Sequence, residues 1–191
     1  MKMLIYCTKY PLYLVRNECD GYFYTMDKGT LNDYKNVETY NGEIVAECDY
    51  EVEEIKWNDI ENYNYEEILP LDKMLEKSCL TKLQLEDYLG GKNGYAIHIK
   101  NLHIFDRPRN LSCYSTYIKE IVNTWWFYLN HKKAKQLEKA PQNMMYCYGN
   151  NTGEKYILIS IHPEWLAKIL NGEKTIEVRK KVLKEMMQNV L

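Results

Sequence analysis

Three charged side chains in the last fifth of the chain have the types and spacing to do chemistry. Lys174, Glu177 and Arg179 follow Gly172 in the stretch NGEKTIEVRK. Period-two alternation predicts a strand from Lys174 to Arg179, with Glu177 and Arg179 on one face and Lys174 on the other. Glu177 and Arg179 are then close enough to pair, or to hold one polar ligand between them. The lysine adds a positive charge for an anion, or a base if burial lowers its pKa.

The elements before these residues predict how they are positioned. Lys155–Ile161 has the apolar content of a strand, and Pro163–Asn171 that of a helix. Proline suits the first helical turn, and Gly172 suits the cap after the helix. The glycine lets the chain reverse and brings Lys174 to the carboxyl end of the helix, where a cation is favoured. The sequence therefore predicts a strand, a helix, a tight turn and a second strand around the charged residues.

This arrangement resembles the ASCH domains, small β-barrels related to the PUA fold of RNA-binding proteins. Gly172, Lys174, Glu177 and Arg179 reproduce the G-x-K-x-x-E-x-R signature of that family, and SIHPEWLAKIL matches the helix that leads into it. The resemblance implies a cleft beside this helix and strand that binds RNA or single-stranded nucleic acid. Lys174 and Arg179 would contact phosphate or base, and Glu177 would orient them. We expect no cofactor.

The order of the matching pieces departs from that family. Pieces that follow the signature in ASCH domains precede it here, at Leu4 to Lys9, Gly42 to Ile55, Tyr95 to Phe105 and Asp106 to Leu111. We therefore expect one circularly permuted ASCH-like domain over residues 1–191, with Asn123 to Glu154 as the joining segment and a helical insert over about 112–142. The alternatives are a tandem pair with a truncated second copy, and partner chains that complete each other's barrels by strand exchange. Permutation is preferred because each piece occurs once.

Short strands with a few intervening helices indicate the fold class. Further strands are expected at Lys2–Thr8, Gly21–Thr25, Gly42–Ile55, Gly94–Phe105 (with a break near Asn101) and Asn143–Tyr148. Helices are expected after the capping pair Thr81 and Gln84, over Ser115–Lys139, and over Lys180–Leu191. Together these elements predict an α+β fold: a small antiparallel, PUA-like β-barrel with flanking helices.

The charges are distributed unevenly along the chain. Residues 1–70 carry 15 Asp and Glu against 6 Lys and Arg, whereas residues 71–191 carry 12 against 19. A basic portion attracts phosphates, which hints at nucleic-acid contact; alternatively, the two halves neutralise each other within one fold. The predicted strand over Gly42–Ile55 has an acidic outer face of Glu47, Asp49, Glu51 and Glu53. We interpret that face as a solvated one rather than a catalytic one.

Cysteine and histidine spacing argues against a metal site. The six cysteines stand singly, without a C-x-x-C pair, and the four histidines lack ligand spacing, so we expect six free thiols and no metal. No apolar run approaches the roughly 20 residues of a membrane helix. The first 15 residues are broken by Lys9 and Pro11 and lack a small-residue cleavage site. We expect a cytoplasmic protein that does not contact a membrane.

Three functions remain open from the sequence. The first is RNA binding, with RNA favoured over DNA. Its candidate binding residues are Lys174, Glu177, Arg179, Lys180, Lys181 and Lys9, with Trp165 and Tyr6 as exposed aromatic rings for base stacking. The favoured alternative for Trp165 is core packing with Ile169, four residues further along the helix.

The second function is hydrolysis, with Lys174 and Glu177 as catalytic residues. Some ASCH-like proteins are amidohydrolases of acetylated cytidine that use Lys and Thr of a K-T-I-T-I-R strand; here Glu177 replaces that Thr. Other relatives are ribonucleases, whose acid–base chemistry the same side chains could support. The third function is binding of a host protein by a factor that a phage or mobile element encodes. The oligomeric state is left open.

Overall fold

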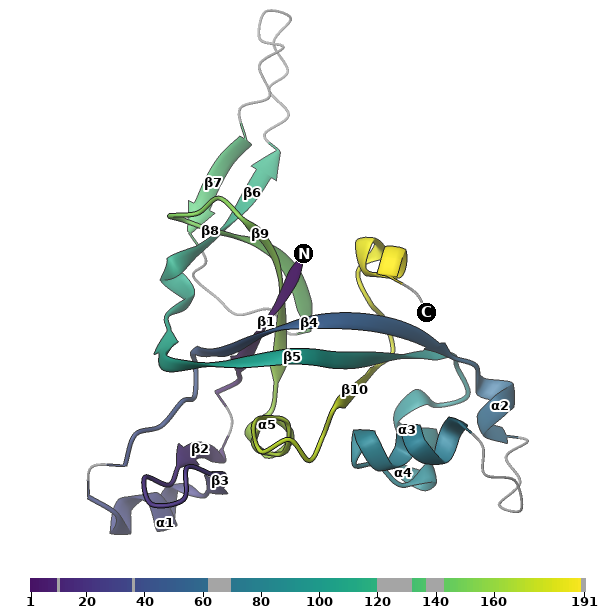
Figure 1. Cartoon of the computed structure of the whole chain (residues 1–191), viewed down its shortest axis with the longest axis horizontal. Coiled ribbons are helices and arrows are strands. Elements are labelled where there is room, and N and C mark those ends of the chain that lie inside the picture. Colours follow the sequence, from purple (N-terminus) through teal and green to yellow (C-terminus); the bar gives the residue numbers. More distant parts are fainter. Residues whose placement is uncertain (10, 36, 62–69, 120–131, 137–142, 190–191) are drawn as a thin grey trace, which may run out of the picture.

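A mixed sheet of eight strands carries the charged residues and most of the core (Figure 1). The computed structural model describes residues 1–9, 11–35, 37–61, 70–119, 132–136 and 143–189. In order across the sheet, the strands are β10 (Ile176–Arg179), β5 (Gly94–Arg109), β4 (Ile44–Ile55), β1 (Lys2–Cys7), β9 (Lys155–Ile161), β8 (Met144–Gly149), β6 (Tyr114–Lys119) and β7 (Lys132–Gln136).

A separate hairpin and several short helices surround this sheet. The hairpin consists of β2 (Tyr13–Arg16) and β3 (Phe23–Met26). The α-helices are α1 (Lys28–Asp33), α2 (Trp57–Glu61), α3 (Pro70–Ser78), α4 (Lys82–Leu89) and α5 (Pro163–Leu170), with 3-10 helices η1 (Leu111–Cys113) and η2 (Lys184–Asn189). The α+β class is therefore confirmed.

The sheet is open rather than a closed antiparallel barrel. β1 pairs with β9 in parallel, from Lys2↔Tyr156 to Cys7↔Ile161. Among the described residues no ladder joins the edge strand β10 to the opposite edge β7. β10 pairs over four residues with β5, and β6 and β7 occupy the far edge. The sheet is nevertheless strongly coiled: in Figure 1, β8 and β9 run at a steep angle to β4 and β5. Such coiling accumulates from the twist between neighbouring strands.

The first strand and the strand of the signature belong to the same sheet, as expected for one domain. β1 lies in the middle and β10 at one edge. The last described helix, η2, packs on β4 and joins β9 through an ion pair between Glu185 and Lys155. The amino-terminal strand lies between these same two strands.

Two expected helices are wrong where the structure describes them. Within Ser115–Lys139, the helix predicted from spacing, β6 and β7 form an antiparallel pair from Ser115↔Gln136 to Lys119↔Lys132. The sequence YSTYIK is rich in β-branched and aromatic residues, which favour a strand. The remainder of that helix and of the proposed 112–142 insert, residues 120–131 and 137–142, lies outside the described residues.

The expected closing helix over Lys180–Leu191 is reduced to the six residues of η2. Val182 and Leu183 lie in a non-helical segment just before η2 and pack against the core. The apolar spacing that predicted a helix therefore reflects core contacts of this segment.

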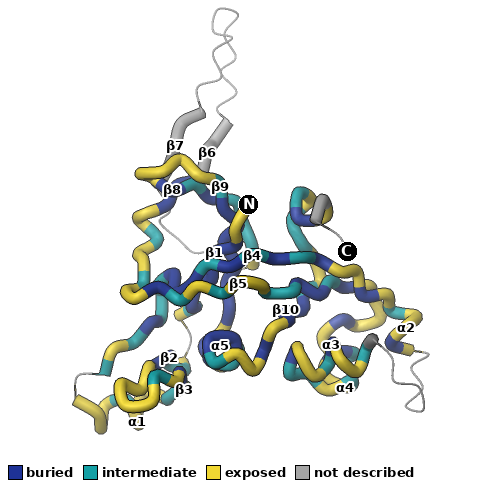
Figure 2. The backbone as a smooth tube through the Cα atoms, in the orientation of Figure 1, coloured by how far each residue is buried: buried dark blue, intermediate teal, exposed yellow. Residues whose placement is uncertain are grey.

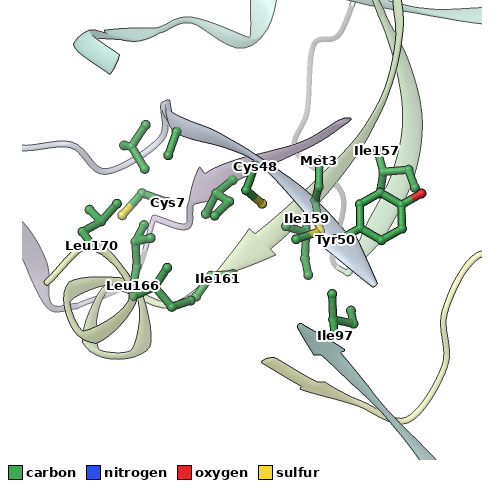
Figure 3. Packing of buried hydrophobic residues seen from close by; sticks show 14 of the residues in the cluster. Met3, Cys7, Cys48, Tyr50, Ile97, Ile157, Ile159, Ile161, Leu166 and Leu170 are labelled. Atoms are coloured by element: carbon green, nitrogen blue, oxygen red, sulfur yellow. The ribbon is translucent and has the colours of Figure 1, made fainter. Parts of the chain in front are cut away.

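Both faces of the sheet bury apolar side chains. The larger cluster contains Met3, Ile5 and Cys7 of β1 together with Leu166 and Leu170 of α5. In Figure 3, Cys7 lies beside Leu166 and Leu170, whereas Met3 lies beside Ile157. The alternate residues of β1, Leu4 and Tyr6, point into a second cluster on the other face. A third cluster lies between α3, α4 and the β5–β10 pair. Figure 2 shows the buried backbone concentrated in β1, β9 and α5.

Asn171, directly after α5, attaches the β2–β3 hairpin to the main body. Its Oδ1 accepts a hydrogen bond from the Phe23 backbone N–H at 2.8 Å, and its Nδ2 donates to the Phe23 carbonyl, also at 2.8 Å. Phe23 itself is buried in the larger core cluster. The Asn171 side-chain amide therefore makes the two hydrogen bonds with Phe23 that a neighbouring strand would otherwise make with β3.

We predict that Asn171→Ala destabilises the protein by about 1–3 kcal/mol, because it leaves both Phe23 backbone groups without a partner. Urea unfolding measures the change. Asn32→Ala, an exposed site on α1, is the matched control and is expected to stay within about 0.5 kcal/mol of wild type. Equal stability of the two variants would contradict this role for Asn171.

All six cysteines are free, as expected, but their environments differ. Cys7, Cys48 and Cys147 are buried, Cys79 is half-buried, and Cys19 and Cys113 are exposed. Burial raises the pKa of each of the three buried thiols to about 12. A thiol held neutral and out of solvent reacts slowly.

No helix in the described part of the chain has the length and apolar content to cross a membrane.

We predict that a disulfide reagent at pH 8 modifies Cys19 and Cys113 rapidly in the folded protein, whereas Cys7, Cys48 and Cys147 react only after unfolding. Mass spectrometry of the labelled peptides identifies the sites. All six should react in denaturant. Rapid native labelling of Cys48 would show that the centre of the sheet is not packed as described.

Candidate functional site

The turn after α5 positions Lys174. Gly172 adopts a positive φ of 78°, which a side chain would strain. The backbone N–H groups of Glu173 and Lys174 then both donate to the Lys168 carbonyl, at 2.9 and 3.1 Å. This turn satisfies the end of the helix and directs the Lys174 side chain inward, where only 3% of the residue is exposed.

Glu177 lies between the two cations of the signature. Its Oε2 is 3.4 Å from Lys174 Nζ, and its Oε1 is 2.9 Å from Arg179 Nε. Glu177 is itself 9% exposed, so the carboxylate is almost fully withdrawn from water. Pairing of Glu177 with Arg179 was expected. The placement of Lys174 on the opposite face was wrong, because the regular strand begins only at Ile176 and strand alternation does not reach back to Lys174.

Arg179 connects β10 to the middle of the sheet. Its Nη2 donates to the Ser160 carbonyl at 2.7 Å, and its Nη1 donates to Asn143 Oδ1 at 3.0 Å. Ser160 belongs to β9, which is four places from β10 in the strand order. The coiling of the sheet brings these strands together, so a guanidinium spans the gap that the backbone ladder leaves open.

Lys174 also touches a carbonyl group and an aromatic ring. Its Nζ donates to the Ser78 carbonyl at the end of α3, at 2.7 Å. The same Nζ lies 5.1 Å from the ring centre of Trp165, and Lys168 Nζ lies at the same distance from that ring. Trp165 is half-buried in the first turn of α5. The ring is thus an aromatic surface beside two cations.

Burial lowers the pKa of Lys174, and the neighbouring Glu177 carboxylate opposes that shift. The cluster of Lys174, Glu177 and Arg179 carries two positive charges and one negative charge when all are ionised. A buried site with excess positive charge favours an anionic or carbonyl-bearing ligand. A lysine with a lowered pKa also has a larger neutral fraction to accept a proton. Within the described ranges no three His, Cys, Asp or Glu side chains gather as a metal site would require.

The other sequence-predicted residues are dispersed. Lys180 and Lys181 continue from Arg179 and are exposed, and Lys180 Nζ lies 5.1 Å from the ring centre of Tyr88. Lys9 is exposed and its side chain lies over Gly42. The expected exposure of Tyr6 is wrong: it is 4% exposed within the second core cluster, on the opposite face of β1 from α5. The structure therefore brings together Lys174, Glu177, Arg179 and Trp165.

Sequence reasoning missed the partners that complete this cluster. Ser78 and Ser160 contribute backbone carbonyls, which no residue type reveals. Asn143 and Lys168 contribute side chains. The position of Lys168, six residues before Lys174 on the predicted helix, was the one available signal.

Comparisons with family models, with curated proteins and with solved structures found no match for this chain.

Proposed function

We propose that this protein is an ASCH-like module that binds RNA or single-stranded nucleic acid at the surface around Lys174, Glu177 and Arg179. The observation that carries the proposal is the buried cluster with excess positive charge, which lies against the half-buried ring of Trp165. A cation beside an aromatic ring suits a nucleotide, which offers both a phosphate and a base face.

Because the cluster is buried, its inner residues and the exposed lysines around it would have different roles in binding. Lys174 and Glu177 are too enclosed to follow a flexible phosphate backbone, and they orient Arg179 and the Trp165 ring instead. Lys168 is half-exposed, and Lys180 and Lys181 are exposed. These three outer lysines are therefore placed to neutralise phosphates.

We predict that Lys180→Ala/Lys181→Ala weakens binding of a labelled 12-nucleotide single-stranded RNA. The slope of log affinity against log salt should fall by about one for each phosphate that the variant no longer neutralises. Fluorescence anisotropy at several salt concentrations measures both quantities. Lys28→Ala/Lys35→Ala removes two exposed lysines of the amino-terminal part as the control and should leave the slope unchanged.

Trp165→Leu should weaken the same RNA by about fivefold or more, because stacking of one base contributes about 1–3 kcal/mol. Trp57→Leu, at a half-buried tryptophan packed against the third core cluster, is the control. Melting temperatures of all variants separate weaker binding from impaired folding. Indistinguishable affinities for the Lys180/Lys181 and Trp165 variants and their controls would remove this surface as the binding site.

A second candidate function, hydrolysis of an acetylated nucleoside, is favoured by the lowered pKa of Lys174. Neutral Lys174 would take a proton from water as that water adds to the acetyl carbon. The carbon–nitrogen bond then breaks, the base amine receives a proton, and acetate leaves. Glu177 stands where some ASCH-like amidohydrolases have Thr, and beside Lys174 it would hold the protonated amine.

If this second function is correct, N4-acetylcytidine is converted to cytidine at a rate that rises with pH. The rate rises with pH because only the neutral amine of Lys174 accepts a proton. Since the pKa of Lys174 is lowered, this neutral form appears at a pH below the ordinary lysine value of 10.5. Ultraviolet absorbance follows the reaction. Lys174→Met should abolish turnover, whereas Lys180→Ala should leave it unchanged. Absence of turnover in the wild type at any pH would exclude this substrate.

A further inference from the structure

A hollow of about 750 Å³ lies on the amino-terminal part of the molecule, away from the signature residues. Its walls come from the β2–β3 hairpin, from the segment after α1, and from the far end of β5. In Figure 1 these elements lie at the lower left, on the side of α5 away from α3 and α4. Figure 2 shows that α1 and the far end of β5 are largely exposed, whereas the strands of the β2–β3 hairpin are mostly buried or half-buried. Its volume is within the range of ligand sites.

Three carboxylates on this wall, those of Glu18, Glu38 and Asp106, have no cationic partner within 4 Å among the described residues. Glu38 accepts a hydrogen bond of 3.4 Å from the Tyr40 hydroxyl. Burial, and then Glu38, raise the pKa of Tyr40; Arg16 opposes this shift, and Glu18 acts in the same direction as Glu38. Glu18, Glu38 and Asp106 therefore line the same hollow, with Glu38 in contact with Tyr40.

Carboxylates elsewhere in the molecule do have partners, as the acidic face of β4 shows. Glu47 is 2.6 Å from Lys2 Nζ, and Glu53 is 2.9 Å from His98 Nε2. Glu51 pairs with Lys100. Glu47 and Glu51 are therefore paired with lysines of neighbouring strands and Glu53 has a partner in His98, whereas the carboxylates of the hollow remain available to a cation from outside the chain.

Tyrosine rings provide the second half of a cation site. Tyr24 and Tyr34 line the hollow and are 45% and 55% exposed. The hydroxyl of Tyr24 donates to Asp20 Oδ2 at 3.0 Å, which fixes the ring direction. An exposed aromatic face beside carboxylates attracts Lys and Arg side chains.

The two cations of the lining do not fill this role. Arg16 Nε donates to the Gly21 carbonyl at 3.4 Å, and its guanidinium lies 5.6 Å from the centre of the Phe23 ring, so it is engaged with its own hairpin. Lys35 is exposed and makes no ion pair with a described residue. The charged groups of the lining therefore sum to a net negative charge.

We propose that this hollow binds a basic segment of a partner protein, with an Arg or Lys side chain held between Tyr24, Tyr34 and the carboxylates of Glu38 and Asp106. The charge complementarity determines the class of partner, because unpaired carboxylates repel nucleic-acid phosphates and attract guanidinium and ammonium groups. The site is independent of the proposed nucleic-acid surface, which lies around α5 and β10.

The test uses the full chain and a fluorescein-labelled hexa-arginine peptide, with hexaglutamate as the opposite-charge probe. Fluorescence polarisation should show saturable binding of hexa-arginine alone. Glu38→Gln/Asp106→Asn should weaken it by at least about fivefold. Glu61→Gln/Asp87→Asn, two exposed carboxylates on α2 and α4, is the matched control and should weaken it by less than about twofold.

The tyrosines separate a built site from general attraction to an acidic protein. Tyr34→Ala should weaken binding by about threefold while Tyr34→Phe, which keeps the ring, retains it. Tyr22→Ala changes an exposed tyrosine of the same hairpin that is outside the lining and should have no effect. Equal losses in the two carboxylate pairs, or no difference between Tyr34→Ala and Tyr22→Ala, would overturn the proposal. Loss of single-stranded RNA binding in the Glu38/Asp106 variant would instead assign the hollow to nucleic acid.

Discussion

The buried carboxylate of Glu177 is the constraint on which the rest of the site depends. Burying an ion costs several kcal/mol unless partners replace its water, and here two buried ions, Lys174 and Glu177, lie beside the half-buried guanidinium of Arg179. Glu177 pairs with both cations, the Ser78 carbonyl accepts a hydrogen bond from Lys174, and the Ser160 carbonyl and Asn143 Oδ1 accept from Arg179. These contacts fix the position of β10 relative to three other parts of the fold: the end of α3, the turn after α5, and β9. Loss of Glu177 alone would leave two like charges facing each other in a low-dielectric site.

That requirement also explains the form of the sheet. A flat sheet would hold β9 far from β10, because β5, β4 and β1 lie between them. Coiling brings the two together, and the Arg179 guanidinium then provides a closure that the backbone ladder does not. The antiparallel barrel expected from the resemblance and the sheet observed here differ in closure and in the parallel pairing of β1 with β9. Side-chain hydrogen bonds hold the two strands where a barrel would use a β-ladder.

Local sequence patterns predicted some elements and not others, and length alone did not decide which: the long helix expected over Ser115–Lys139 was wrong, whereas the four-residue β3 overlaps the strand expected at Gly21–Thr25. The alternation in β4 and the capping pair around Thr81 each identify an element by local rules, and the structure has them as expected. β2 and α1, of four and six residues, are too short to show a period. Within the site, the pairing of Glu177 with Arg179 follows from strand spacing. Coiling of the sheet brings in Asn143 and the Ser160 carbonyl, and packing of α3 beside β10 brings in the Ser78 carbonyl; both depend on contacts far apart in the chain.

The uneven charge of the sequence has two different outcomes in the fold. On β4, acidic residues of the first half meet basic residues of the second across adjacent strands, as Glu51 does with Lys100, so their charges cancel within the molecule. Among the described residues the β2–β3 hairpin forms a sheet of its own, joined to the segment after α1 by a single bridge between Val15 and Thr39. Its carboxylates therefore keep their charge at the surface. The same composition thus leaves excess positive charge in the cluster of Lys174, Glu177 and Arg179 and excess negative charge in the lining of the hollow, and our two proposals rest on this difference.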